Sequence, residues 1–520
     1  MTRLSASFAL AAAALFGSSL LGCGLSSGKQ ESTGYSGEGG SPGGGSGGAT
    51  SARGKRAGGT GTQTPADETV ADPNGNAPEL VCFGDTPQRA YFMSADDSNS
   101  MASPAIAREW LNAKQAPPAA AIRTYEFLNY YNAIYDIPAM GDGLGVHADL
   151  VALPASDTDK GVRFRLQVGV QAFEVPRVPL VITYVVDTSG SLVGTGIERE
   201  RSAILAIADH LRAGDVLNVV TWSTKENVLL EGYVAHGDSS DKTTLAQAVG
   251  ALLPGGGSDL HAGLTKAYSL AEAHFDAAAL NRVVLLSDGG ANLGVLDSDA
   301  IEAAAAKAEA DGIYLVGVGI GPSTAYTDSL MNLVTDAGRG AYVYLDTPEE
   351  AQTLFNERFD EIMNVAARAV KVEVDLPDYL EIDQFYGEAY AEDPEAIQPQ
   401  NLAPGDSMIF NETLYVTDLQ ALCGADKIGV VVKWQTPLDH EEKKTTLPPV
   451  DLDTLTAKLP SPQMRKAEAV IAYAEALKSG AQPALAAALE TVKSAAKEAP
   501  SDKDLQEISG LLQKHPALQN

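Results

Sequence analysis

Cysteine and histidine are scarce in this chain, which has three cysteines and seven histidines among its 520 residues. No histidine falls in an H-E-x-x-H motif or another zinc-binding pair. The chain also lacks the G-x-x-x-x-G-K loop that holds nucleotide phosphates. These absences exclude zinc proteases and P-loop nucleotide hydrolases. His261 follows Ser258 by three residues, so it either approaches the loop described below or packs on its own helix.

Basic residues are outnumbered, because 37 Lys and Arg stand against 68 Asp and Glu, a net charge of −31. Such a chain repels a phosphate backbone, so nucleic acid is not expected as a partner. The acidity either keeps the protein soluble or concentrates cations at its surface. Hydrophobic residues make up 45% of the chain, which is enough for a sizeable core. This length favours about two to four domains.

Residues 1–22 have the pattern of a signal peptide. Arg3 provides the positive charge, and the apolar run that follows is too short to serve as a secure membrane span. The run ends in L-L-G followed by Cys23, which resembles the lipobox of bacterial lipoproteins, where the cysteine becomes lipidated. The alternative is an ordinary secretory signal with an incidental cysteine. Gly24 rather than Asp follows Cys23, which by analogy with enteric bacteria favours the outer membrane over the inner one.

Residues 23–78 are rich in Gly, Ser and Thr and cannot bury enough apolar surface to fold. A flexible coil of roughly 50 residues reaches on the order of 40 Å. We therefore expect a disordered tether that holds the folded part away from the membrane.

Cys82 and Cys423 are the cysteines that stay available once Cys23 is lipidated. Export usually leads to an oxidising compartment, which favours a disulfide between them. Two free buried thiols are the alternative.

Helical patterns lie at both ends of the remaining chain. Residues 79–142 contain two helix-like stretches, 103–113 and 119–131, and form a helical N-terminal region. Residues 461–516 are rich in Ala, Leu, Lys and Glu at helical spacing and predict a C-terminal helical segment.

Apolar and polar residues alternate on both sides of the central part of the chain. The alternation is clearest over residues 162–168, 370–374 and 428–434, and it predicts half-exposed strands. We infer a β-sandwich built from residues 143–178 and 366–450, with the central domain inserted between them.

Residues 179–355 alternate between strand and helix patterns, which is typical of an open, mostly parallel sheet covered by helices on both faces. The expected strands are residues 180–186, 217–222, 227–234, 282–286, 313–318 and 341–345, and the expected helices are residues 198–212, 242–252, 260–274, 298–311 and 323–337.

Three loops of this domain carry oxygen ligands at the expected carboxyl edge of the sheet. The first strand ends in a D-T-S-G-S loop with Asp187, Ser189 and Ser191. A P-G-G-G-S-D loop offers Ser258, and an S-D-G-G loop offers Asp288. Two carboxylates and three hydroxyls suit a hard divalent cation, and the few protein ligands favour Mg²⁺ over a full Ca²⁺ cage. Ca²⁺ and Mn²⁺ are the alternatives, and a metal-free, degenerate site is a further one.

The D-x-S-x-S motif resembles that of von Willebrand factor type A (VWA) domains with a metal-ion-dependent adhesion site, and the other two loops resemble that family's remaining metal loops. The resemblance implies direct coordination by Ser189, Ser191 and Ser258. It implies that Asp187 and Asp288 act directly or through water. The family usually has Thr where this chain has Ser258, which keeps the hydroxyl but leaves the rigidity of the loop less well defined.

Residues 211–215 and 281–289 also resemble bacterial VWA domains, and residues 119–138 resemble the helical region that precedes the domain in bacterial VWA lipoproteins. The expected fold is therefore α/β, with a doubly wound, Rossmann-like VWA sheet inserted in a β-sandwich and flanked by helices.

The sequence favours a binding protein over an enzyme. Ser189 has no evident general base, and no second metal site accompanies Asp187 and Asp288, so a metal-assisted hydrolase lacks support. Our first hypothesis is a lipid-anchored bacterial cell-envelope protein whose cation binds an Asp or Glu carboxylate of a protein partner. The alternative is an envelope scaffold whose metal serves stability only.

Overall fold

The computed structural model describes residues 86–154, 161–294, 298–310 and 312–519. The expected signal peptide, the expected tether, Cys23 and Cys82 lie outside the described residues. Within the described part of the chain, no helix is both long and apolar enough to cross a membrane.

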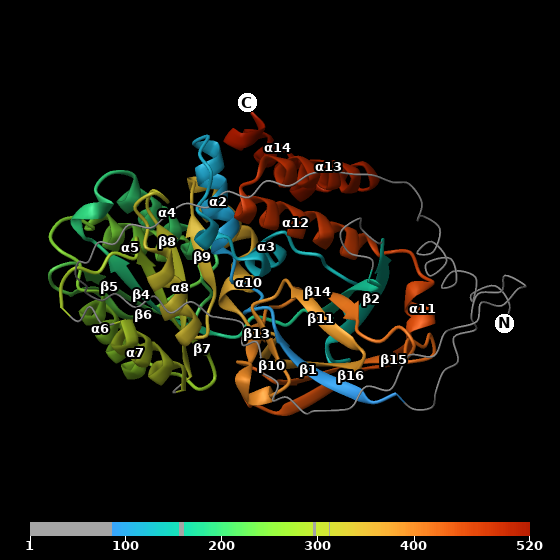
Figure 1. Cartoon of the computed structure of the whole chain (residues 1–520). Coiled ribbons are helices and arrows are strands. Elements are labelled where there is room, and N and C mark those ends of the chain that lie inside the picture. The colour runs from blue at the N-terminus through green and yellow to red at the C-terminus, as the bar shows by residue number, and fades with distance from the viewer. Residues whose placement is uncertain (1–85, 155–160, 295–297, 311, 520) are drawn as a thin grey trace, which may run out of the picture. The chain divides into compact units, whose positions relative to one another are not determined.

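A six-stranded sheet forms the centre of the inserted domain (Figure 1). Its strand order is β6-β5-β4-β7-β8-β9, and every neighbouring pair is parallel except β5 and β6. The strands are β4 (Leu180–Asp187), β5 (Val216–Trp222), β6 (Asn227–Val234), β7 (Leu280–Ser287), β8 (Ile313–Ile320) and β9 (Tyr342–Leu345). This is the doubly wound α/β fold that the sequence predicts.

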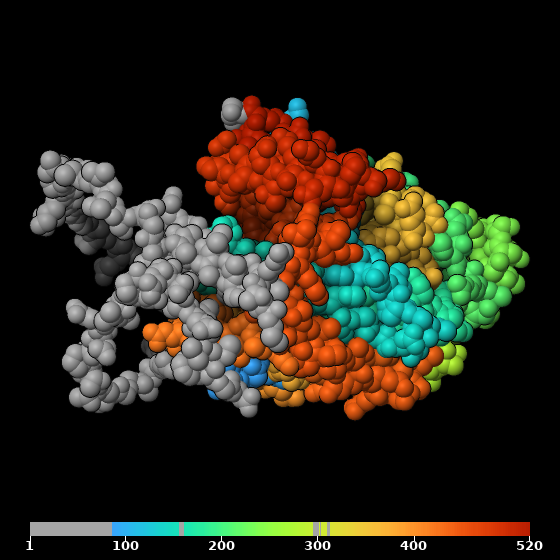
Figure 2. Space-filling view, turned by 90° about the vertical axis from the view of Figure 1, so that its right-hand side faces the viewer, coloured from blue at the N-terminus to red at the C-terminus, as the bar shows by residue number. Residues whose placement is uncertain are grey.

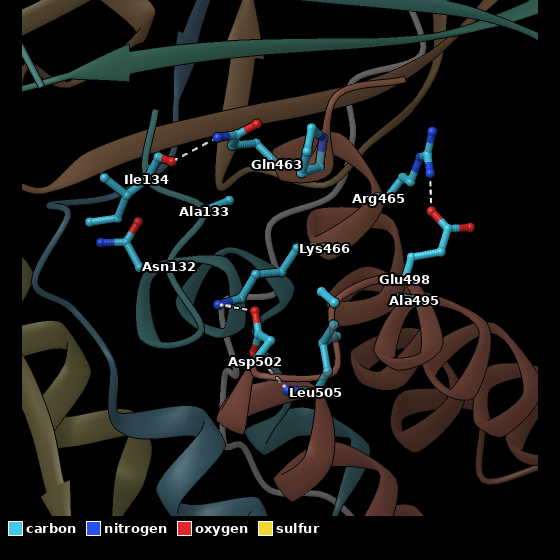
Figure 3. Close-up of a pocket in the computed structure, with 12 residues that line it drawn as sticks. Asn132, Ala133, Ile134, Gln463, Arg465, Lys466, Ala495, Glu498, Asp502 and Leu505 are labelled. Carbon is cyan, nitrogen blue, oxygen red and sulfur yellow. Dashed lines mark hydrogen bonds and ion pairs between the residues drawn. The ribbon is translucent and has the colours of Figure 1, made fainter. Parts of the chain in front are cut away.

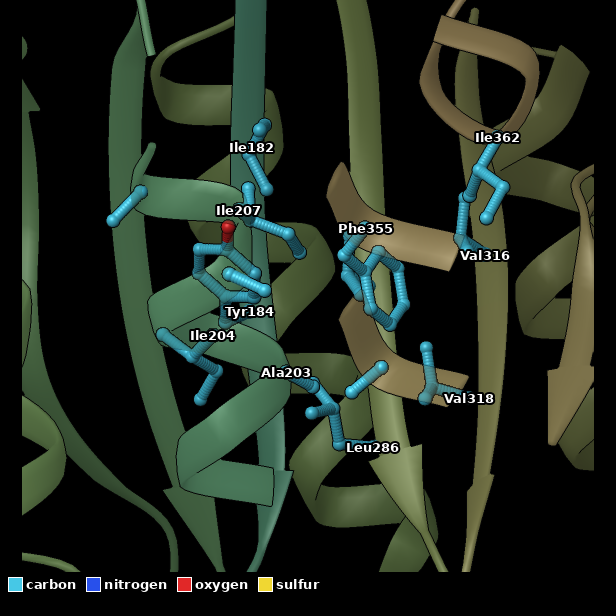
Figure 4. Close-up of a cluster of buried hydrophobic side chains, with 14 of the residues drawn as sticks. Ile182, Tyr184, Ala203, Ile204, Ile207, Leu286, Val316, Val318, Phe355 and Ile362 are labelled. Atoms are coloured by element: carbon cyan, nitrogen blue, oxygen red, sulfur yellow. The ribbon is translucent and has the colours of Figure 1, made fainter. Parts of the chain in front are cut away.

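Helices cover both faces of this sheet. The strands β4, β7 and β8 are buried along their whole length, which explains their nearly continuous apolar sequences. Figure 4 shows one face, where Ile204 and Phe355 pack on Tyr184 and Val318. The helices are α4 (Thr195–Ala208), α5 (Ser239–Gly250), α9 (Pro348–Gln352) and α10 (Phe359–Met363) on this face, and α6 (Leu260–Ala273), α7 (Ser298–Ala310) and α8 (Asp328–Ala337) on the other.

Three helix starts differ from the expected ones by three residues or more. The helix α5 begins earlier, at Ser239, because the Asp238 side chain caps it by accepting from Ser240 N. The helix α4 begins earlier, at Thr195, because Gly194 turns the chain with a φ of 97°. The helix α8 begins later, at Asp328, because the residues before it form a turn in which Ala325 N donates to Pro322 O.

Two antiparallel sheets combine strands from before and after the inserted domain. The first has the order β12-β1-β10-β15-β16, with β13 also paired to β10, and the second has the order β11-β14-β3-β2. The strands are β1 (Gln88–Ser94), β2 (Gly145–Leu153), β3 (Arg163–Gln171), β10 (Ala367–Pro377), β11 (Leu380–Phe385), β12 (Ala389–Ala391), β13 (Gln400–Leu402), β14 (Ser407–Val416), β15 (Lys427–Gln435) and β16 (Glu442–Asp451).

The strand β1 corrects one expectation, since residues 79–142 were expected to be helical. Tyr91 and Met93 alternate inward on β1, which pairs with β10 almost 300 residues later in the chain. A strand of seven residues gives too short a pattern to reveal such a distant partner.

The flanking helices pack together in one apolar cluster. Phe127 on α3 lies against Tyr473 on α12 with ring centroids 5.3 Å apart. Figure 2 shows the C-terminal helices in red above the orange strands of residues 427–451. The helices of this cluster are α2 (Ala102–Asn112), α3 (Thr124–Tyr130), α12 (Pro462–Ser479), α13 (Gln482–Glu498) and α14 (Lys503–Lys514), whereas the short helix α11 (Leu452–Thr456) lies beside β2 and β16.

The prediction of a single continuous helix over residues 119–131 is wrong. The chain forms a 3₁₀ turn at Ala119–Ala121 and then α3, because Ile122 and Arg123 between them take extended backbone angles.

Candidate functional site

The site lies where the strand order of the central sheet reverses. After β4 the chain adds β5 on one side of β4 and later β7 on the other. In open α/β sheets this is the position where ligands bind, at the carboxyl ends of the strands. Asp187 is the last residue of β4 and Ser287 is the last residue of β7.

Hydrogen bonds at both carboxylate oxygens fix Asp187, which is fully buried. Its Oδ1 accepts from the backbone N–H of Ser189 at 2.8 Å, and its Oδ2 accepts from Ser287 Oγ at 2.8 Å. The hydroxyls of Ser189 and Ser191 lie 3.0 Å apart. The first loop therefore gathers one carboxylate and two hydroxyls, with Ser191 at the exposed end.

Backbone hydrogen bonds join the second loop to the first. Gly255 N donates to Thr188 O at 2.8 Å, and Gly190 N donates to Gly256 O at 3.2 Å. Gly256 has a φ of 86°, a conformation that favours glycine at this close approach. The loop ends at Ser258.

The third loop joins the second through Ser258, which is buried. Ser258 Oγ donates to the carbonyl of Gly290, and Ser258 O accepts from the N–H groups of Asn292 and Leu293. Asp288 is also buried, and its Oδ1 accepts from Gly290 N at 2.9 Å. All five predicted ligand residues thus lie on three loops that are bonded to one another.

The electrostatics of the site favour a cation. Burial, with a smaller contribution from the charge of Asp288, raises the pKa of Asp187 to about 7. The hydrogen bonds from Ser189 and Ser287 oppose this rise. Two buried carboxylates that repel each other fit a divalent cation, which would favour their charged forms. The described residues contain no cluster of three or more His, Cys, Asp or Glu side chains with metal-binding geometry.

Glu200 is a residue near this site that the sequence analysis missed. It is fully buried on α4, and neither of its carboxylate oxygens has a hydrogen-bond partner among the described residues. Burial raises its pKa well above the usual range, and the charges of Asp187 and Asp288 add to this rise. The sequence contains one indication that Glu200 is buried, because this residue lies in the apolar stripe of the helix between Ile197 and Ile204.

A pocket of about 420 Å³ lies elsewhere, between the residues after α3 and the C-terminal helices (Figure 3). Its charged groups are already paired. Arg465 is bonded to Glu498, and Lys466 Nζ lies 3.1 Å from Asp502 Oδ2. The pocket therefore offers no unpaired charge for chemistry or ligand binding.

Cys423 is buried and takes part in a disulfide bond. Its expected partner, Cys82, lies outside the described residues, so the pairing stays a prediction.

The fold and the three loops define the class of this protein. Residues 182–357 match the von Willebrand factor type A domain family, and residues 90–163 match a family described as von Willebrand factor. The chain therefore contains a VWA domain, in agreement with the resemblance noted from the D-x-S-x-S loop.

Among known proteins, the chain is similar to the uncharacterized protein YfbK of Escherichia coli strain K12, with 27% identity over 75% of this chain and 71% of the relative. It also resembles inter-alpha-trypsin inhibitor heavy chain H2 of Sus scrofa, with 28% identity over 35% of this chain and 20% of that protein. A von Willebrand factor type A structure from Catenulispora acidiphila covers 72% of this chain and 91% of its own, with 15% identity and a TM-score of 0.47.

Proposed function

We propose that this protein binds a protein partner through a divalent cation held by its VWA domain. The observation that carries the proposal is the convergence of three hydrogen-bonded loops at the point where the strand order reverses. The cation would be held by Asp187, Ser189, Ser191, Ser258 and Asp288.

The chemistry of these residues supports Mg²⁺, with Ca²⁺ and Mn²⁺ as alternatives. The bound cation would supply a Lewis-acidic position for an Asp or Glu carboxylate of the partner. The hydroxyls of Ser189, Ser191 and Ser258 are neutral, so two carboxylates balance the charge of the ion. Domains of this family generally mediate protein–protein interaction. This supports binding rather than catalysis.

We place the protein in the bacterial cell envelope, anchored through a lipid on Cys23 and held off the outer membrane by residues 23–78. The lipobox-like sequence and the Gly- and Ser-rich composition support this location. Replacing Cys23 with Ser tests it, because the variant is expected to leave the membrane fraction of cells.

A metal-dependent capture experiment tests the binding function. The full chain, immobilised with Mg²⁺, is expected to retain partners from envelope extracts and to release them with EDTA. Asp187→Ala should retain none of the EDTA-released partners. Asp209→Ala is the matched control, because Asp209 is exposed and its carboxylate forms a surface ion pair with Lys242. Retention that is equal with EDTA and in Asp187→Ala would contradict the proposal.

The alternative function is a scaffold whose cation serves stability only. The mutual repulsion of Asp187 and Asp288 favours it, since a cation would relieve that repulsion without any partner. For a scaffold, EDTA would lower the melting temperature while the captured partners stay the same.

A further inference from the structure

Each loop of the candidate cation site carries one large apolar side chain that faces solvent. The exposed fractions are 66% for Val193, 82% for Leu253 and 39% for Leu293. We call these three residues the apolar rim. They stand close to the ligand residues in sequence, since Val193 follows Ser191 by two positions and Leu293 follows Asp288 by five.

Contacts between the loops place Leu293 and Leu253 beside the candidate cation site, and Val193 follows two of its ligand residues in the first loop. Leu293 N donates to Ser258 O at 3.0 Å, and a side chain at Gly257 would collide with Leu293 Cδ1. Leu253 precedes Gly255, which is bonded to the first loop, by two residues, a separation of at most about 7 Å between Cα atoms.

The apolar rim does not serve the core. Leu192 and Leu252, directly before two of its members, are the buried residues that pack inside the domain. Single exposed apolar residues are common on any protein. Here, however, three of the five large apolar side chains that are exposed among the described residues of 179–355 lie on these loops. The five are Val193, Val234, Leu253, Phe275 and Leu293.

Positive charge is absent from the three loops, because residues 187–196, 253–259 and 287–294 contain no Lys or Arg. The neighbouring loop supplies Lys225 and Glu226, which are both exposed and of opposite sign. A bound cation would therefore be the main electrostatic attraction for a carboxylate at these three loops, and Val193, Leu253 and Leu293 add apolar contact surface beside it.

We propose that the partner presents one Asp or Glu carboxylate flanked by aliphatic or aromatic side chains, which lie against Val193, Leu253 and Leu293. This inference rests on the proposed cation site. It predicts binding that needs the metal yet depends weakly on NaCl, since apolar contacts are not screened by salt.

A selection from random cyclised peptides displayed on phage tests the proposal without a known partner. The full chain is immobilised with Mg²⁺, and bound phage are eluted with EDTA. The enriched peptides are expected to share an Asp or Glu with Leu, Ile, Val, Met, Phe or Trp beside it. Enrichment of acidic residues flanked by polar or basic ones would contradict the proposed contacts of the apolar rim but would agree with the cation site. Enrichment without Asp or Glu, or binding that EDTA does not release, would overturn both.

A variant with Val193→Ser, Leu253→Ser and Leu293→Ser separates the rim from the metal. It is expected to bind the best selected peptide about tenfold more weakly and Mg²⁺ as tightly as the unaltered chain. Leu459→Ser is the matched control, because Leu459 is 82% exposed but outside the VWA domain. Unchanged peptide affinity in the triple variant would contradict the proposal. A loss of Mg²⁺ affinity would also contradict it, because it would show that the three side chains stabilise the loops that hold the metal.

Discussion

Ser258 is the proposed ligand that connects the second and third loops of the candidate site. It is buried between two loops and bonded to Gly290. The VWA resemblance places Thr at this position, and Ser keeps the hydroxyl while losing a methyl group. The site therefore keeps its full set of oxygen donors.

Replacing Ser258 with Ala removes one neutral donor. We expect the Mg²⁺ affinity to fall at least about tenfold, because the ion loses a protein ligand that water replaces less well. Ser258→Thr should bind Mg²⁺ as the unaltered chain does. Isothermal titration calorimetry measures the Mg²⁺ affinity of both variants. An undiminished affinity in Ser258→Ala would show that Ser258 is not a ligand of the metal.

A second prediction concerns Glu412 on β14. It is buried, neither of its carboxylate oxygens has a hydrogen-bond partner among the described residues, and burial raises its pKa to about 8. In the unfolded chain the pKa of Glu is about 4.3. Between these values the folded state binds more protons, so this residue lowers the free energy of unfolding as the pH rises from about 4 to 8.

Replacing Glu412 with Gln removes its contribution to the pH dependence of the free energy of unfolding. We expect the variant to be about 1–2 kcal/mol more stable than the unaltered chain at pH 9 and to gain nothing at pH 5. Denaturant unfolding at the two pH values measures this. An equal change at both would show that Glu412 is not protonated in the folded state.

At the scale of elements, Arg108 links α2 to the end of β9, to α9 and to α14. Its guanidinium is 2.7 Å from Asp346, 2.5 Å from Glu350 and 3.2 Å from Glu507. The first two carboxylates are buried. Arg108 therefore stabilises two buried carboxylates, those of Asp346 and Glu350, with a single positive charge.

Arg108→Met would leave those carboxylates without their cation. We expect a loss of about 3–5 kcal/mol in the free energy of unfolding, and a partial recovery in Arg108→Lys, which lacks the planar fork. The exposed pair of Lys242 and Asp209 is the control, and Lys242→Met should change stability by less than about 1 kcal/mol. Chemical denaturation measures all three variants, and a neutral Arg108→Met would contradict this role.

The elements also show what a sequence can predict. The six strands of the VWA sheet were predicted within a few residues, because buried parallel strands such as β4 are apolar throughout. The motifs also predicted that the three loops with the candidate ligands lie together at the carboxyl edge of the sheet, and hydrogen bonds join these loops in the structure. Glu200 was not predicted, because its burial against the charges of Asp187 and Asp288 depends on how α4 packs. The pairing of β1 with β10 was missed for the same reason, since it joins distant segments.

At the scale of the whole molecule, the VWA domain interrupts the two antiparallel sheets, so strands far apart in sequence must pair. β3 pairs with β14 and β1 pairs with β10 across the insertion. Cys423, which follows β14, takes part in a disulfide bond.

Cys423→Ser, or reduction of the chain, is expected to lower the free energy of unfolding by about 2–4 kcal/mol. Peptide mapping of the oxidised protein should recover Cys423 joined to Cys82. A Cys423 peptide joined to any other cysteine would contradict that pairing.

The central claim is that the VWA domain holds a divalent cation through Asp187 and its four companion ligands. Titration calorimetry of Mg²⁺ into the full chain and into Asp187→Ala tests it most directly. We predict saturable binding to the unaltered chain and a loss of at least about a hundredfold in affinity for Asp187→Ala. Equal Mg²⁺ affinity in the two proteins would contradict the claim.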